Sequence, residues 1–137
     1  AELGRALAEV GARTRRRSLV VIISDGMEEP SAWLPALGAF GRRTTDVRFV
    51  HVYDPRELRL EIDQASLLYS PEGGDALPVD PGGARREFAD VVRSYLEEVR
   101  SGVVRAGGLY VPMPTDRPLE EAVRAVVLGR PLDVVPP

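Results

Sequence analysis

Apolar residues recur at helical spacing in four segments of the chain and form short β-branched runs in three others. The helical segments cover about residues 3–12, 30–41, 81–106 and 119–129, and the runs cover 18–24, 47–53 and 109–113. Helical and extended segments therefore alternate along the chain. Such alternation predicts the α/β class, with a parallel sheet, right-handed crossovers and helices on both faces.

A further segment, about residues 62–79, interrupts this alternation. It contains two short apolar stretches, at 67–69 and 76–79, separated by the turn-forming residues 71–75. This pattern predicts a small β-hairpin insertion. The chain has 137 residues, a length typical of one domain, so we expect a single domain over 1–137 with one hydrophobic core.

The first strand, residues 18–24, raises a question about the completeness of this sheet. Residues 19–23 are uniformly apolar, which is typical of a parallel strand covered by helices on both faces. However, the other two predicted strands both follow it in the sequence, so we expect it to lie at the sheet edge. An exposed apolar edge favours pairing with another chain. We therefore expect an incomplete domain, the C-terminal part of a larger one, or self-association through this edge.

Composition excludes several classes of function. The chain has no cysteine and one histidine, His51, so disulfides, a thiolate nucleophile and cysteine-based zinc sites are excluded. Any metal would be held by oxygen atoms. A net charge of -3 argues against nucleic acid as the main partner. The longest apolar run is far shorter than the roughly 20 residues needed to span a bilayer, so we expect no membrane insertion by this chain and a cytoplasmic location.

The most informative candidate site is Ser24-Asp25-Gly26, at the carboxyl end of the first strand. In an open α/β sheet, ligands bind beyond these strand ends, and a carboxylate is a suitable ligand for a hard divalent cation. We therefore take Asp25 as the candidate metal ligand, with Ser24 and Gly26 at the periphery. The alternative is an Asx-type turn, in which Asp25 accepts hydrogen bonds from the following backbone.

The other candidates are better explained by structural roles. Glu28 and Asp54 could extend an acidic site, but Glu28 precedes Pro30 and could favour a helix start, and Asp54-Pro55 is typical of a turn. Asp116 follows the third strand and could be a cap. His51 lies inside a strand, which favours a buried histidine over a ligand or a base.

Nucleophilic catalysis has little support. The chain contains neither a Gly-x-Ser-x-Gly motif nor any lysine for a phosphate-binding loop, and a serine-histidine pair would have to use a histidine within a strand. We therefore expect that the protein is not an enzyme.

Residues 19–26 resemble the fourth strand of a von Willebrand factor A domain, an apolar strand that ends in Ser/Thr-Asp-Gly. Residues 46–58, the hairpin ending at 79–81, the long helix after it, and residues 115–122 follow in the order seen in one bacterial subfamily. This subfamily consists of uncharacterised von Willebrand A-like proteins encoded beside MoxR-type AAA+ ATPases. The chain resembles the C-terminal half of such a domain.

The resemblance implies a Rossmann-like sheet with a metal-ion-dependent adhesion site at its carboxyl edge. In that family the site combines an Asp-x-Ser-x-Ser loop, a threonine from a later loop, and the aspartate of the Ser/Thr-Asp-Gly strand. Only the last of these matches this sequence, at Asp25, because the chain contains no Asp-x-Ser-x-Ser. The resemblance therefore implies that Mg²⁺ or another divalent cation is bound in the complete domain, with most ligands outside this chain.

These observations favour a non-enzymatic protein-binding module over two other functions. The resemblance implies a protein partner, with a MoxR-type AAA+ ATPase as the candidate, a role in assembly or maturation, and a full-length protein that could be membrane-anchored. The first alternative is a metal-dependent phosphoester hydrolase, which would need several histidines and acids around two metals. The second is a metal-free scaffold in which Asp25 only braces a loop.

Overall fold

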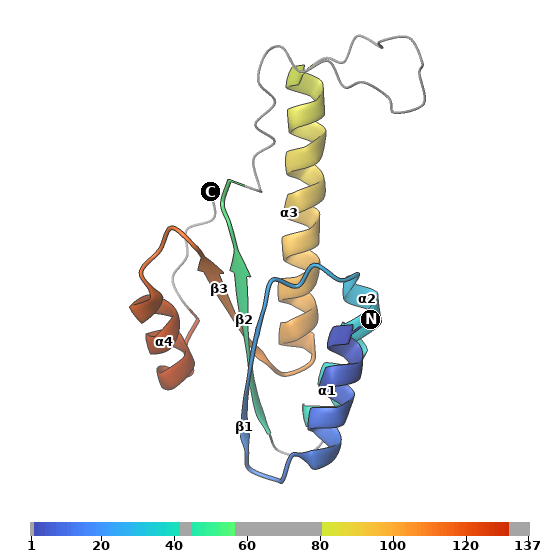
Figure 1. Ribbon diagram of the computed structural model, residues 1–137, viewed down its shortest axis with the longest axis vertical. Coiled ribbons are helices and arrows are strands. Elements are labelled where there is room, and N and C mark those ends of the chain that lie inside the picture. Colours follow the sequence, from blue (N-terminus) through green and yellow to red (C-terminus); the bar gives the residue numbers. More distant parts are fainter. Residues whose placement is uncertain (1, 42–44, 57–80, 132–137) are drawn as a thin grey trace.

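The computed structural model describes residues 2–41, 45–56 and 81–131 and confirms the predicted alternation of helices and strands (Figure 1). The predicted hairpin at 62–79 lies outside the described residues. Strands and helices follow each other in the order α1 (Glu2–Arg13), β1 (Leu19–Ser24), α2 (Pro30–Gly41), β2 (Asp46–Tyr53), α3 (Pro81–Arg105), β3 (Leu109–Pro114) and α4 (Leu119–Leu128).

The three strands form an open, fully parallel sheet in the order β1-β2-β3. Ser24 at the end of β1 is aligned with His51 of β2, and Tyr53 at the end of β2 is aligned with Pro114 of β3. The carboxyl ends of all three strands therefore lie at one edge of the sheet. This is a Rossmann-like α/β arrangement, as predicted.

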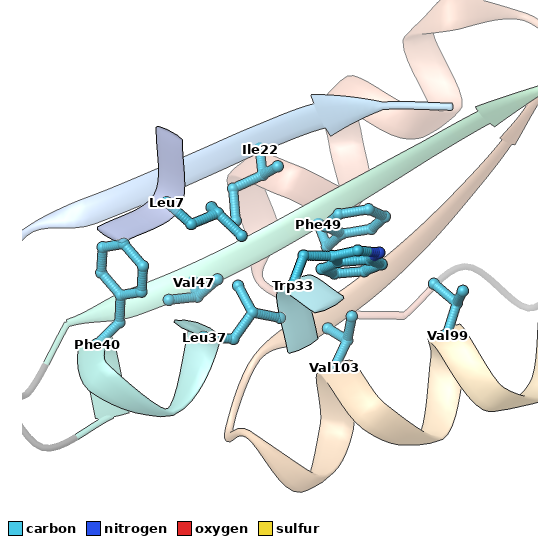
Figure 2. Close-up of a cluster of buried hydrophobic side chains, with 9 residues drawn as sticks. All are labelled: Leu7, Ile22, Trp33, Leu37, Phe40, Val47, Phe49, Val99 and Val103. Atoms are coloured by element: carbon cyan, nitrogen blue, oxygen red, sulfur yellow. The ribbon is translucent and has the colours of Figure 1, made fainter. Parts of the chain in front are cut away.

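One face of the sheet is covered by α1, α2 and α3, which lie on the same side of the strands (Figure 1). The side chains between them form the larger hydrophobic core, in which Trp33 of α2 stacks on Phe49 of β2 with ring centroids 4.9 Å apart (Figure 2). All its buried members are labelled in the figure: Leu7, Ile22, Trp33, Leu37, Phe40, Val47, Phe49, Val99 and Val103. Burial of these large side chains is the main source of stability on this face.

Among the described residues, the helix that covers the opposite face is α4 (Figure 1). Ala122 and Ala125 of this helix pack against Val50 of β2 and against Val111 and Met113 of β3. Small residues on the buried side of α4 allow the helix to lie close to the sheet. The strands therefore have helices on both faces, but the cover is unequal.

The position of β1 confirms one prediction and corrects another. The strand lies at the sheet edge, as expected from its place in the sequence. However, its expected burial on both faces is wrong for the described residues, because α4 packs over β2 and β3 and leaves β1 uncovered on that side. Leu19, Val21 and Ile23 are consequently 51%, 41% and 71% exposed.

The described helices also bear on membrane insertion. Within residues 2–41, 45–56 and 81–131, no helix combines the length and the apolar character that crossing a bilayer requires. The longest helix, α3, has 25 residues, but charged side chains recur along it.

Candidate functional site

The Ser24-Asp25-Gly26 turn begins where β1 ends and leads into the loop before α2. The Gly26 N–H donates to Ser24 Oγ at 3.1 Å, and the Met27 N–H donates to Asp25 Oδ1 at 3.3 Å. Gly26 has a φ of 65°, in the left-handed region that glycine adopts without strain. The Asx-type hydrogen bond considered as the alternative role of Asp25 is therefore present, although it engages only one carboxylate oxygen.

His51 lies directly beside this turn, because its strand register aligns it with Ser24. Its side chain is 1% exposed, which confirms the prediction of a buried histidine. The Nε2 atom is 2.9 Å from the Asp25 carbonyl oxygen, and Nδ1 is 2.8 Å from the Tyr110 hydroxyl oxygen. A carbonyl oxygen can only accept, so Nε2 must carry the proton, and in the neutral ring Nδ1 must accept from Tyr110.

The surroundings of His51 keep the imidazole neutral. Its ring is in edge contact with four aromatic rings at centroid distances of 5.5 to 6.3 Å, those of Phe49, Tyr53, Tyr95 and Tyr110. Burial lowers the pKa of His51, and the hydrogen bond to Asp25 and the negative charge of its carboxylate oppose this effect only in part. Burial also disfavours the charged form of Tyr110, which raises the pKa of its hydroxyl. The hydroxyl therefore stays protonated and can donate a hydrogen bond.

Tyr95 of α3 contacts the same turn from a second direction. Its hydroxyl donates a hydrogen bond to the Gly26 carbonyl oxygen. Burial raises the pKa of Tyr95, and the negative charges of Asp25, Glu29 and Glu98 raise it further. The phenol is therefore a neutral donor in an acidic environment. A Cβ atom at Gly26 would lie 3.1 Å from both His51 Nε2 and the Tyr95 hydroxyl oxygen, so an added side chain would also crowd these two groups.

Glu28 has a structural role that the sequence did not predict. Its Oε1 accepts a hydrogen bond from the Leu3 N–H at 2.8 Å, so it satisfies a free backbone donor in the first turn of α1. Its backbone oxygen accepts from Trp33 Nε1 at 3.3 Å. The other carboxylate oxygen, Oε2, is buried without a hydrogen-bond partner among the described residues. The carboxylate thus joins the start of α1 to the loop before α2.

Asp54 and Asp116 lie after the other two strands. The Asp54 carboxylate accepts from the backbone N–H of Arg56 at 2.9 Å and forms an ion pair with its guanidinium at 2.7 Å, which lowers the pKa of Asp54. This is the turn role that we considered for Asp54. Asp116 is exposed, and its negative charge contributes to the raised pKa of Tyr53.

These positions limit what the described residues can do with a metal ion. Among them, no group of three or more Asp, Glu, His or Cys side chains could hold a metal. Asp25 has an exposed carboxylate with one oxygen engaged by a backbone N–H, so it fits a single ligand position. A divalent cation needs about six oxygen ligands, so the described residues do not form a complete site.

Asp25 can be identified from the sequence, but the side chains that hold its backbone cannot. Phe49, His51 and Tyr53 alternate along β2, and this spacing signals that they share one face of the strand. Nothing in the sequence pairs His51 with Tyr110 or Tyr95, because these contacts join residues far apart in the chain. The contacts that the sequence does not reveal are therefore tertiary contacts.

Comparison with known proteins gives one match. A family model described as "Protein of unknown function DUF58" matches residues 1–98. No curated protein and no solved structure matches the chain. The matched residues include the Ser24-Asp25-Gly26 turn, His51 and Tyr95, which together form the candidate site. The chain therefore belongs to the DUF58 family.

Proposed function

We propose that the complete domain is a protein-binding module of the von Willebrand A type and that Asp25 supplies one ligand to a divalent cation, Mg²⁺ or a similar ion. The other ligands would come from outside the described residues. When bound, the cation would offer a coordination position to an acidic side chain of the partner. The role of this chain is to hold Asp25 in place at the sheet edge.

The observation that carries this proposal is the contrast between the backbone and the side chain of Asp25. Its carbonyl oxygen accepts from His51, and the next carbonyl oxygen accepts from Tyr95. The carboxylate, in contrast, is exposed and accepts one backbone hydrogen bond among the described residues. A fixed backbone with an accessible carboxylate is what a metal ligand requires, because little ordering remains to be done on binding.

The charges around the turn favour metal dependence. Besides burial, the negative charges of Asp25, Glu29 and Glu98 raise the pKa of Tyr95, so the hydroxyl that holds the turn lies in a negative electrostatic environment. An acidic side chain of a partner would be repelled here, since like charges cost energy when they are brought together. A divalent cation on Asp25 would offset most of this negative charge and offer a coordination position, which would allow a carboxylate to bind.

The family supports a candidate for the partner. DUF58 proteins are associated with MoxR-type neighbours. An ATPase of this type is therefore the partner that we propose to test first, with a role in assembly or maturation. The acidic surface beside Asp25 would then receive a carboxylate of the ATPase through the cation.

The phosphoester hydrolase is a weaker candidate. Both ring nitrogens of His51 are engaged, by Asp25 and by Tyr110, and the ring is buried. The single histidine of the chain could act as a ligand or a base only if these hydrogen bonds were broken. A phosphoesterase assay with Mn²⁺ or Zn²⁺ should therefore give no turnover, and clear turnover would favour the hydrolase.

The decisive experiment measures binding of the complete protein to its neighbouring ATPase with magnesium and with a chelator. Binding should require magnesium and should be lost in Asp25→Ala. Asp46→Ala is a matched control, because Asp46 is an exposed aspartate at the opposite, amino end of β2. Equal binding in chelator would contradict the metal role and would favour the metal-free scaffold.

A further inference from the structure

We propose that His51 and Tyr95 are positioning residues for Asp25: together they fix two successive peptide groups of the turn and so determine where the Asp25 carboxylate lies. The His51 Nε2–H holds the Asp25 carbonyl oxygen at 2.9 Å, and the Tyr95 hydroxyl holds the Gly26 carbonyl oxygen. The inference rests on the proposed function in one respect: the fixed carboxylate is taken to be a ligand of the divalent cation.

The two hydrogen bonds come from different elements. His51 belongs to β2 and Tyr95 to the long helix α3, so the turn after β1 is held by one strand and one helix at once. Because consecutive carbonyl groups are fixed, the peptide planes on both sides of Gly26 are fixed as well. The Asp25 side chain can then rotate mainly about its own side-chain torsions. One of its carboxylate oxygens, Oδ1, accepts a hydrogen bond from the Met27 N–H.

Tyr110 completes the arrangement by selecting the tautomer of His51. Its hydroxyl lies 2.8 Å from Nδ1 and must donate there, because Nε2 already donates to Asp25. A chain of hydrogen bonds thus runs from β3 through β2 to the turn after β1. Each buried polar atom of the imidazole is satisfied, which explains how a histidine can be buried at this position.

A buried histidine that served only for packing would not need the Nε2-protonated tautomer, and it would not need the Asp25 carbonyl oxygen as its partner. The ring could be satisfied by Tyr110 and a second side chain without contact to the turn. Instead, its donor is directed at the backbone of the one residue whose carboxylate is exposed at the end of β1. The side chains behind metal ligands act in this way, and their loss typically weakens metal affinity by about 10 to 100-fold.

The first test needs no metal. His51 is the only histidine of the 137-residue chain, so ¹⁵N-histidine labelling gives one pair of imidazole signals. At pH 7.5 we expect a neutral ring with Nε2 protonated and Nδ1 unprotonated, and a shift of the Nδ1 signal in Tyr110→Phe. An Nδ1-protonated ring, or a freely exchanging mixture of tautomers, would overturn the proposal.

The second test measures the turn and its ligand affinity in the complete protein. In Tyr95→Phe we expect faster amide exchange at Met27 and about 10-fold weaker binding of magnesium chloride by calorimetry. His51→Leu should behave alike, whereas His51→Gln should recover much of the affinity, because its amide can donate to the Asp25 carbonyl. Tyr53→Phe is the control, since it removes a tyrosine hydroxyl and keeps the ring that contacts His51.

The outcomes separate this inference from the proposed function. If the unaltered protein binds magnesium and Tyr95→Phe binds it equally well, the positioning role is overturned while the metal role of Asp25 stands. If the unaltered protein does not bind magnesium, the metal role is overturned. The positioning role is then decided by the imidazole signals and by the exchange at Met27, which support it if they change as described and overturn it if they do not.

Discussion

Gly26 combines two requirements at one residue. Its φ of 65° costs a residue with a side chain roughly 1 to 2 kcal/mol, and an added Cβ would lie 3.1 Å from both His51 and Tyr95. Gly26→Ala should therefore lower the free energy of unfolding by about 2 kcal/mol or more. The measurement is urea denaturation followed by the fluorescence of Trp33.

Gly107 offers a matched control for this prediction. It also has a positive φ, 82°, but an added Cβ would meet no atom within 4 Å. Gly107→Ala should cost about 1 to 2 kcal/mol through backbone strain alone. If both variants lost the same stability, the close contact of the turn with His51 and Tyr95 would not be significant.

Protonation of His51 should make the stability depend on pH. Its pKa in the unfolded chain is near the ordinary value of 6.5, and burial lowers the pKa in the folded protein. As the pH falls through 6.5, the unfolded chain gains a proton that the folded protein does not take up. The free energy of unfolding should therefore decrease as the pH falls, by up to about 1.4 kcal/mol per pH unit, until the folded pKa is reached.

The change is measured by urea denaturation in metal-free buffer between pH 7.5 and 5, and His51→Gln isolates it. Glutamine does not titrate, while the carboxylates of the two proteins are the same. The difference in stability between the unaltered protein and the variant should be constant above pH 7 and should shrink below 6.5. A difference that is independent of pH would show that the histidine titrates alike in the folded and unfolded chain.

Among the helices, the contact between α2 and α3 depends on Gly102. A Cβ atom there would lie only 2.4 and 2.8 Å from the two terminal carbons of Leu34, so the Leu34 side chain of α2 occupies the space beside this glycine. Gly102→Ala should lower the stability by about 1 to 3 kcal/mol, because the small gain in helix propensity does not offset the crowding. Thermal unfolding followed by circular dichroism measures this change.

Gly38 in α2 provides the opposite case within the same layer. An added Cβ would meet nothing within 4 Å. Gly38→Ala should raise the stability by about 0.5 to 1 kcal/mol, because alanine loses less backbone entropy in a helix. If Gly102→Ala were also stabilising, Leu34 would have to repack at little cost, and its contact with Gly102 would not limit the residue at this position.

The elements themselves were predictable because their signals are local. The apolar runs at 18–24, 47–53 and 109–113 correspond to β1, β2 and β3, and Pro30 begins α2 as expected. The uneven cover of β1 was not predictable, because the apolar pattern of Leu19 and Ile23 does not reveal which strands α4 will contact. Asp25 could be named from its place after a strand, whereas its contacts to His51 depend on strand register.

At the scale of the whole molecule, the sheet is buried unevenly. The face toward α1, α2 and α3 contains the large core around Trp33, and on the face toward α4 the described residues cover only β2 and β3. The edge of β1 therefore has backbone groups available for pairing beside exposed apolar side chains, among the described residues. This combination is a recognised source of association between sheets.

Self-association through this edge should depend on Ile23, which is 71% exposed on the uncovered side of β1. We expect the chain to associate as its concentration increases, and Ile23→Lys to shift it toward monomer, because a lysine on an edge strand opposes pairing with a second sheet. Sedimentation velocity at several concentrations measures the shift. Val127→Lys is the matched control, since Val127 is 70% exposed on α4 and the substitution adds the same charge. If Val127→Lys dissociated the assembly and Ile23→Lys did not, the surface of α4, and not the edge of β1, would form the contact.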